Sequence, residues 1–341
     1  MIPPKGSLQI LPAAIALVLL VWCTGCMGGV QQERITLNVV AAGSLLYPFE
    51  EIEREFERTH PFVDVNVEGH GSIQAIRQVT DLHRRFDVVA VADESLVPDL
   101  MYRPMDGSGQ NFTENYTPFA GNEMVIAYTD ASRGADEITD ENWPEILRRQ
   151  DVRIGISNPM LDAAGYRGLM VLMLADSEPG TTGLFDDVIG KAFDPPLAVE
   201  SSNGTRRLVL PEILRPKSQK IAVRDGSIYL LSLLDAGGID YAFEYRSVAD
   251  AHGLRWIDLP SGIDLSDDDY ADEYGTVQVR LGFQRFASIG SERTGRRIVY
   301  AITVPANAPN AALAREFVDF VAGSFRQDRH GWPKPLSAAP E

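Results

Sequence analysis

Cysteine is almost missing from this sequence: there are two in 341 residues, Cys23 and Cys26, both close to the N-terminus. The rest of the chain therefore has no disulfide, no thiolate metal ligand and no cysteine nucleophile. Positive charge is also scarce, since 31 Lys and Arg stand against 48 Asp and Glu, giving a formal net charge of −17. This balance argues against nucleic-acid binding and opposes any anionic ligand. An anion site here must therefore rely on local hydrogen-bond donors.

The motifs of several enzyme classes are missing as well. There is no G-x-G-x-x-G or Walker loop, and Gly69-His70-Gly71-Ser72 does not match the G-x-S-x-G nucleophile elbow. His70 and Ser72 suggest a base and a nucleophile, but residues two apart on an extended segment point the same way without having to touch. We therefore predict no enzyme and no cofactor, and keep an exported hydrolase as the distant alternative. The histidines show no metal-ligand spacing; they are His60, His70, His83, His252 and His330.

The N-terminus has the features of a secretory signal. A lysine precedes the apolar run Ile15–Cys23, which is short for a transmembrane helix. The following Thr24-Gly25-Cys26 resembles a lipoprotein processing site, so Cys26 is the expected lipidated residue of a membrane-anchored cell-surface protein. Cys23 is the competing choice, and a plain signal peptide or uncleaved anchor is the alternative to both. The expected signal segment and the linker after it are residues 1–26 and 27–33.

Beyond the linker, strand-like apolar runs alternate with amphipathic helical patterns. In Pro48–Arg58, for example, Phe49, Ile52 and Phe56 recur at helical spacing. Regular alternation of this kind predicts an α/β fold with mostly parallel, doubly wound sheets. The expected strands include 34–42, 62–69, 86–93, 122–129, 153–159, 220–224, 239–245 and 298–305, and the expected helices include 48–58, 71–82, 165–177, 227–237 and 312–323. We expect a solvated loop at Ser266–Glu273 and a poorly ordered tail over residues 326–341.

Two strand-to-helix junctions share one form. Gly43-Ser44 and Gly71-Ser72 each follow an apolar strand and precede a helix. Such junctions meet at the carboxyl edge of a parallel sheet, where ligands bind. Unpaired N–H groups at the helix starts, with serine hydroxyls beside them, would form an anion cradle that needs no cation. The alternative is that Ser44 and Ser72 are ordinary helix caps.

Almost the whole exported length resembles a known family, through "AGSLLYPFEEIEREFE", "VEGHGSIQAIRQVTDL", "SNPMLDAAGYRGLMVLMLAD" and "GGIDYAFEYRSVADAHGLRWIDLP". These segments look like the tungstate/molybdate-binding proteins of archaeal-type ABC transporters. The resemblance implies a type II periplasmic-binding-protein fold with two lobes, crossing hinge strands and an oxyanion between the lobes. The resemblance implies molybdate or tungstate as the ligand and an ABC permease as the partner in the membrane. We expect the protein itself to be a monomer. The expected lobes are residues 34–121 plus about 301–325, and residues 122–300.

The family's oxyanion-binding residues can be matched to this chain. They correspond to the corner Gly43-Ser44, to Ser72, to Asp162 before Gly-Tyr-Arg, and to Tyr245 in the strand D-Y-x-x-x-Y. In the family, two carboxylates are thought to bond the metal of the oxyanion and raise its coordination from four to six. Sulfur cannot be bonded in this way, which gives the family a means of rejecting sulfate. Asp162 is the first of these carboxylates.

The second carboxylate is where this chain departs from the family. The family has a glutamate at the start of the helix after K-I-x-V-R, and this chain has Ser227 there. Glu244 and Asp225 are alternative sources of a carboxylate, but Glu244 should face away if its neighbour Tyr245 faces the site. We therefore expect Ser227 to donate to the oxyanion and discrimination against sulfate to be weaker. A receptor for sulfate or another tetrahedral oxyanion is the nearest alternative function.

Overall fold

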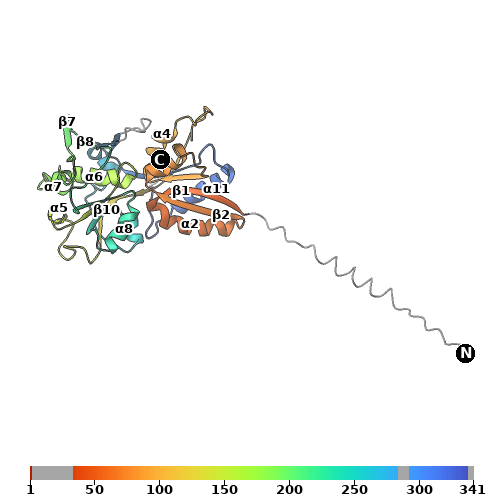
Figure 1. Cartoon of the computed structure of the whole chain (residues 1–341), viewed down its shortest axis with the longest axis horizontal. Coiled ribbons are helices and arrows are strands. Elements are labelled where there is room, and N and C mark those ends of the chain that lie inside the picture. The colour runs from red at the N-terminus through yellow and green to blue at the C-terminus, as the bar shows by residue number, and fades with distance from the viewer. Residues whose placement is uncertain (2–33, 283–291, 337–341) are drawn as a thin grey trace. The chain divides into compact units, whose positions relative to one another are not determined.

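The computed structural model describes Met1, residues 34–282 and residues 292–336 (Figure 1). The expected signal segment after Met1, the expected linker up to Glu33 and the last five residues of the expected tail lie outside the described residues. The described residues from Thr36 onward form one compact unit. Within the described residues, no helix is both long and apolar enough to cross a membrane.

The first sheet has six strands in the order β15-β4-β14-β3-β1-β2. Its centre is apolar: every residue of β3 and of β14 is buried. β1 pairs with β3 in parallel, whereas β14 pairs antiparallel with both β3 and β4. The strands span Ile35–Ala42 (β1), Val63–His70 (β2), Val88–Val91 (β3), Thr117–Asn122 (β4), Ile298–Thr303 (β14) and Lys334–Pro335 (β15).

The middle of the chain forms two further sheets. In a five-stranded sheet in the order β11-β5-β10-β6-β9, strands β10, β6 and β9 are parallel, and β5 runs antiparallel to both of its neighbours, β10 and β11. Its strands are Met124–Tyr128 (β5), Ile154–Ser157 (β6), Ile221–Arg224 (β9), Tyr241–Tyr245 (β10) and Arg255–Ile257 (β11). A four-stranded sheet in the order β13-β12-β8-β7 contains Val199–Ser202 (β7), Thr205–Val209 (β8), Val277–Arg280 (β12) and Glu292–Thr294 (β13).

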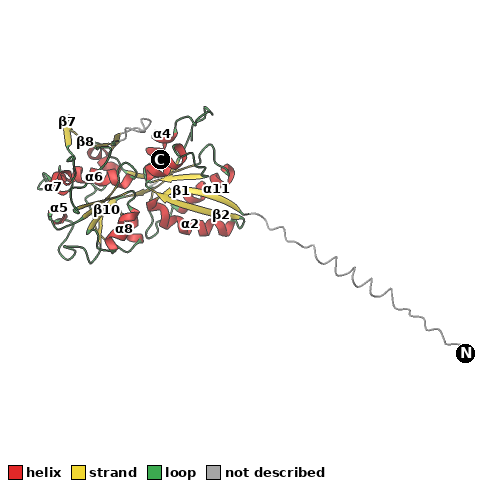
Figure 2. Ribbon diagram, in the orientation of Figure 1, coloured by secondary structure: helices red, strands yellow, loops and turns green. Residues whose placement is uncertain are grey.

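Helices cover these sheets and connect their strands (Figure 2). α2 and α11 pack together beside the first sheet through Phe56 and Phe317, whose ring centroids lie 5.1 Å apart. α6 contacts β6, β10 and β12, so it joins the second and third sheets. The helices are Leu46–Thr59 (α2), Ser72–Thr80 (α3), Leu96–Met101 (α4), Trp143–Arg148 (α5), Ala163–Ala175 (α6), Leu184–Val188 (α7), Ile228–Asp235 (α8), Arg246–Ala251 (α9), Ala271–Tyr274 (α10) and Ala311–Ser324 (α11), with 3-10 turns at Gly43–Leu45 (η1), Gly190–Ala192 (η2) and Asp268–Tyr270 (η3).

The chain passes between the first two sheets with almost no linker. β4 in the first sheet ends at Asn122 and β5 in the second begins at Met124, so Glu123 alone separates them. The chain returns to the first sheet as β14, which pairs with β4. These crossing strands belong to the predicted two-lobed type II periplasmic-binding-protein fold. The sheets are mixed rather than mostly parallel, because the crossing strands run antiparallel to their neighbours.

Two local predictions were wrong. The expected tail is part of the fold up to residue 336, because Trp332 is buried against Phe325 and β15 pairs with β4. The expected Asp-rich loop forms η3 and α10, because Tyr274 at its end is fully buried and fixes the segment. Sequence composition alone gave no sign of either anchor, since each depends on one aromatic residue in a polar segment.

We predict that Trp332→Ala lowers the free energy of unfolding by about 3–5 kcal/mol, the usual cost of deleting a large buried aromatic side chain. Denaturant unfolding of the exported chain measures this. Ile213→Ala is the matched control, because Ile213 is 58% exposed and its loss should change stability little. Equal stability of the Trp332 variant and the wild type would restore the loose-tail interpretation.

Candidate anion-binding site

Four helix starts meet where the first and second sheets approach each other. η1 follows β1, and α3 follows β2 in the first sheet, while α6 follows β6 and α8 follows β9 in the second. The N–H of Gln74 in α3 donates to the carbonyl of Leu161, just before α6, at 3.0 Å. A Cβ built on Gly43 would lie 3.1 Å from the side chain of Ile228 in α8. The two predicted Gly-Ser corners therefore lie against the second sheet's helix starts.

Gly71 is required by this close approach. A Cβ added at Gly71 would lie 2.4 Å from the Leu161 carbonyl oxygen and 2.8 Å from Cβ of Asp162. Neither contact can relax cheaply, because one partner is backbone and the other begins a buried side chain. Any larger residue at this position would push α3 and α6 apart.

Ser44 lies at the end of a chain of hydrogen bonds that starts in the crossing strands. Asn122 Nδ2 donates to the Tyr300 hydroxyl at 3.1 Å, and that hydroxyl donates to Ser44 Oγ at 2.9 Å. Asn122 and Tyr300 belong to β4 and β14. Because Ser44 Oγ accepts from behind, its own proton is left to be donated forward. Ser44 is almost fully buried, which strengthens such a bond.

Ser72 is arranged in the same way. Its Oγ accepts a hydrogen bond of 3.0 Å from the backbone N–H of Ala92, and the side chain is fully buried. The N-cap of α3 is Gly71 and Ser72 is its first helical residue, so Ser72 does not occupy the position of an ordinary cap. The Ser72 proton is therefore also available to a ligand.

Tyr245 is the third hydroxyl with this geometry. Arg167 Nη1 donates to the Tyr245 hydroxyl at 2.7 Å and to the carbonyl of Ala92 at 2.6 Å. Asp93, 3.5 Å from the guanidinium, balances this buried charge. Burial raises the pKa of Tyr245 well above its usual value, so the hydroxyl keeps its proton. Sequence reasoning missed Arg167, although it belongs to the quoted Gly-Tyr-Arg motif, and also missed Tyr300 and Asn122.

Asp162 connects several helix starts. The backbone N–H of Ser227 donates to Asp162 Oδ2 at 2.8 Å, which ties α6 to α8. Burial raises the pKa of the Asp162 carboxyl, and the N–H groups of Ser227 and of Ser72 in α3 oppose that rise. The structure thus brings Asp162 together with Ser72 and Ser227.

Glu244 does not face away, and that expectation was wrong. Ser227 Oγ donates to Glu244 Oε1 at 3.0 Å, and the Tyr245 N–H donates to the same oxygen at 2.8 Å. Strand alternation fails as a guide here because Glu244 is next to the end of β10, where its long side chain reaches the start of α8. In this arrangement the Ser227 hydroxyl donates its only proton to Glu244, so it has none left to donate to an oxyanion. Asp225 is exposed and lies outside this buried cluster.

His70 is not paired with Ser72. Its Nε2 lies 2.7 Å from Glu68 Oε1, and Arg84 donates to the other oxygen of Glu68 at 2.6 Å. The Arg84 guanidinium holds the pKa of Glu68 down to about 2. The base–nucleophile geometry of a hydrolase is therefore not formed by these two residues. Within the described parts of the chain, no group of three or more His, Cys, Asp or Glu could hold a metal ion.

Comparisons with known proteins agree on one family. A family model described as bacterial extracellular solute-binding protein matches residues 37–328. The "Molybdate/tungstate-binding protein WtpA" of Thermococcus kodakarensis is 38% identical over 90% of this chain and 85% of its own. The protein of the same name from Pyrococcus abyssi is 38% identical over 95% of this chain and 92% of its own. The solved sulfate-binding protein SubI of Mycobacterium tuberculosis shares the fold, with a TM-score of 0.50 and 11% identity over 85% of this chain and 82% of its own.

The buried carboxyl of Glu244 predicts a pH effect on stability. Burial raises its pKa to about 8 in the folded chain, so the unfolded chain ionises first as pH rises. Its contribution to stability is therefore complete below pH ~4.5 and is lost progressively up to pH ~8. Relative to the wild type, Glu244→Gln should gain stability across this window, by up to roughly 4 kcal/mol. Denaturant unfolding of both proteins from pH 5 to pH 8.5 tests this, and parallel curves would contradict it.

Proposed function

The chain belongs to the family of bacterial extracellular solute-binding proteins, and we propose that its solute is molybdate or tungstate, which it delivers to an ABC permease. It is a solute-binding protein and not an enzyme. The names of the Thermococcus and Pyrococcus relatives support this choice of ligand, since both match nearly the whole chain. We propose that it acts as a monomer.

The observation that carries this proposal is the orientation of three hydroxyl groups. Ser44, Ser72 and Tyr245 each accept a hydrogen bond from a donor behind them. Each therefore keeps a proton that it can donate to an oxygen of a tetrahedral dianion. Donors fixed in advance bind an anion without the reorganisation that water needs.

Closure of two lobes around the oxyanion explains the tight contacts at Gly71. We propose that the lobes are residues 34–121 with about 301–325, and residues 122–300. The Gln74–Leu161 hydrogen bond, between α3 and the residue before Asp162, supports this division, and we propose that it forms when the lobes close. Because β4 and β14 supply Asn122 and Tyr300, the crossing strands are linked to Ser44.

Sulfate is the second candidate ligand, and Ser227 favours it. A carboxylate at this position could bond the metal of molybdate but only repel sulfate, whereas a serine does neither. We propose that Asp162 keeps its place at the ligand and that Ser227 makes discrimination between molybdate and sulfate weaker than a second metal-directed carboxylate would.

Isothermal titration calorimetry with molybdate, tungstate, sulfate and phosphate tests the proposal. We predict binding of molybdate and tungstate by the wild type, and a ten- to hundredfold loss in Ser44→Ala and in Ser72→Ala. The reason is that a hydrogen bond to a charged group contributes roughly 1.5–3 kcal/mol.

Tyr300→Phe is the matched control for Ser44. It removes only the hydroxyl that donates to Ser44 Oγ. Ser44 keeps its own proton but is free to turn, so we expect a loss smaller than that of Ser44→Ala. Wild-type affinity in both serine variants would show that the two serines only support their helix starts.

We propose that Cys26 carries a lipid that anchors the protein at the cell surface. The Thr24-Gly25-Cys26 sequence is the support for this proposal. Cys26→Ser should release the protein into the medium or leave its signal uncleaved, as seen by fractionation and by mass spectrometry of the N-terminus. Cys23→Ser should do less. The reverse pattern would assign the processing site to Cys23.

A further inference from the structure

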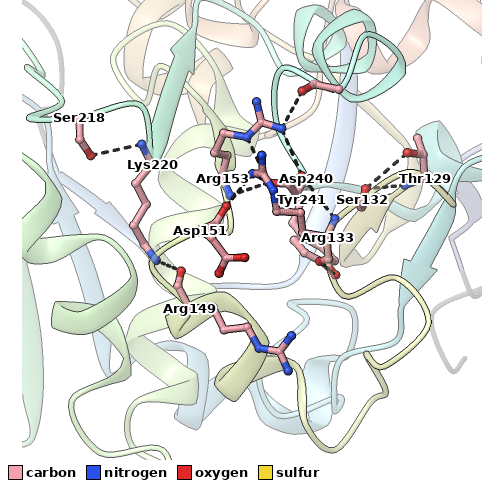
Figure 3. Close-up of polar contacts among 11 residues, drawn as sticks. Thr129, Ser132, Arg133, Arg149, Asp151, Arg153, Ser218, Lys220, Asp240 and Tyr241 are labelled. Carbon is pink, nitrogen blue, oxygen red and sulfur yellow. Dashed lines mark hydrogen bonds and ion pairs between the residues drawn. The ribbon is translucent and has the colours of Figure 1, made fainter.

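The strand β10 carries a buried carboxylate at each end, and the two are compensated in different ways. Asp240, just before the strand, accepts from Arg153 Nε at 3.2 Å, from Arg133 Nη1 at 3.0 Å and from the Arg153 N–H at 2.7 Å. Figure 3 shows the two arginines converging on it. These bonds account for Asp240 as a structural ion pair.

Glu244, at the other end, is satisfied on one oxygen only. Oε1 accepts from the Ser227 hydroxyl and from the Tyr245 N–H. Oε2 has no hydrogen-bond partner among the described residues, and the side chain is completely buried. A buried carboxylate oxygen without a donor is costly, and such an atom in a native fold calls for an explanation.

Its surroundings point to a neutral acid. Burial and the charge of Asp162 raise the pKa of Glu244 to about 8. Because Oε1 already accepts two bonds, the proton belongs on Oε2, where it makes that oxygen a donor. A donor with nothing to bond remains buried beside Asp162 and Ser227, among the helix starts described above.

We propose that Glu244 is an anion-binding residue of the oxyanion site, and that it donates a hydrogen bond through its protonated Oε2 to the bound anion. This inference rests on the proposed function. Ser227 and the Tyr245 N–H act as positioning groups, because they hold Oε1 and so fix the direction of Oε2. In the family a glutamate stands at the position of Ser227. Here Glu244, from the next strand, would take the place of that glutamate, and it would act as a neutral hydrogen-bond donor instead of a metal-directed carboxylate.

Two substitutions at Glu244 separate the roles of shape, proton and charge. Glu244→Met fills a similar volume without any donor, whereas Glu244→Gln keeps an N–H where the acid has its O–H. We expect the Met variant to bind molybdate and sulfate ten- to hundredfold more weakly, and the Gln variant to lose about threefold. Asp240→Asn is the control. Asp240 is also a buried carboxylate, just before the same strand, and we assign it a structural role alone. Its replacement should lower stability and leave affinity unchanged.

Calorimetry with molybdate, tungstate and sulfate, alongside thermal unfolding of each variant, gives the outcome. Wild-type affinity in a folded Glu244→Met variant would overturn the inference and leave the proposed function intact. A Gln variant as weak as the Met variant would also overturn it, because charge rather than a donated proton would then matter. A wild-type chain that binds none of the three anions would overturn the proposed function as well.

Discussion

A dianion can be held in a protein of net charge −17 only if its oxygens are met by donors that are already in place. The structure around the candidate site follows from this requirement. Hydroxyls of Ser44, Ser72 and Tyr245 are each oriented by a donor behind them, and those donors come from a crossing strand, a backbone N–H and a buried arginine. The arginine itself is neutralised by Asp93 and does not serve as the counter-ion of the ligand.

The same donors link recognition to closure. Tyr300 and Asn122 lie on the strands that cross between the sheets, and Ala92 and Asp93, just after β3 of the first sheet, hold Arg167 of α6. Separation of the two sheets would therefore break the contacts of Arg167 with Ala92 and Asp93 and disturb the donor behind the Tyr245 hydroxyl, whereas the bonds that orient Ser44 lie within the first sheet. An open form of the chain would have poorly aligned donors, and binding would favour the closed form. Under the proposed function, this would let the permease distinguish a loaded receptor from an empty one.

Much of this could be predicted from the sequence, and the exceptions have physical causes. Strand–helix alternation and the Gly-Ser corners predicted the α/β class and the place of Ser44 and Ser72, because local patterns determine both. Arg167, Tyr300 and Asn122 were missed because their roles depend on contacts between segments far apart in the chain. Glu244 was misplaced because alternation does not hold for a long side chain at a strand end. Trp332 was missed because one aromatic residue in a polar segment carries no periodic signal.

X-ray absorption spectroscopy of the chain loaded with molybdate most directly tests whether the anion is held by hydrogen-bond donors. With Ser227 unable to bond the metal and Glu244 protonated, the two carboxylate ligands needed for six-coordination are not both present. We predict a tetrahedral oxyanion with four short metal–oxygen bonds. A six-coordinate metal with two additional oxygen ligands would contradict this account, and would mean that Glu244 binds as a carboxylate together with Asp162.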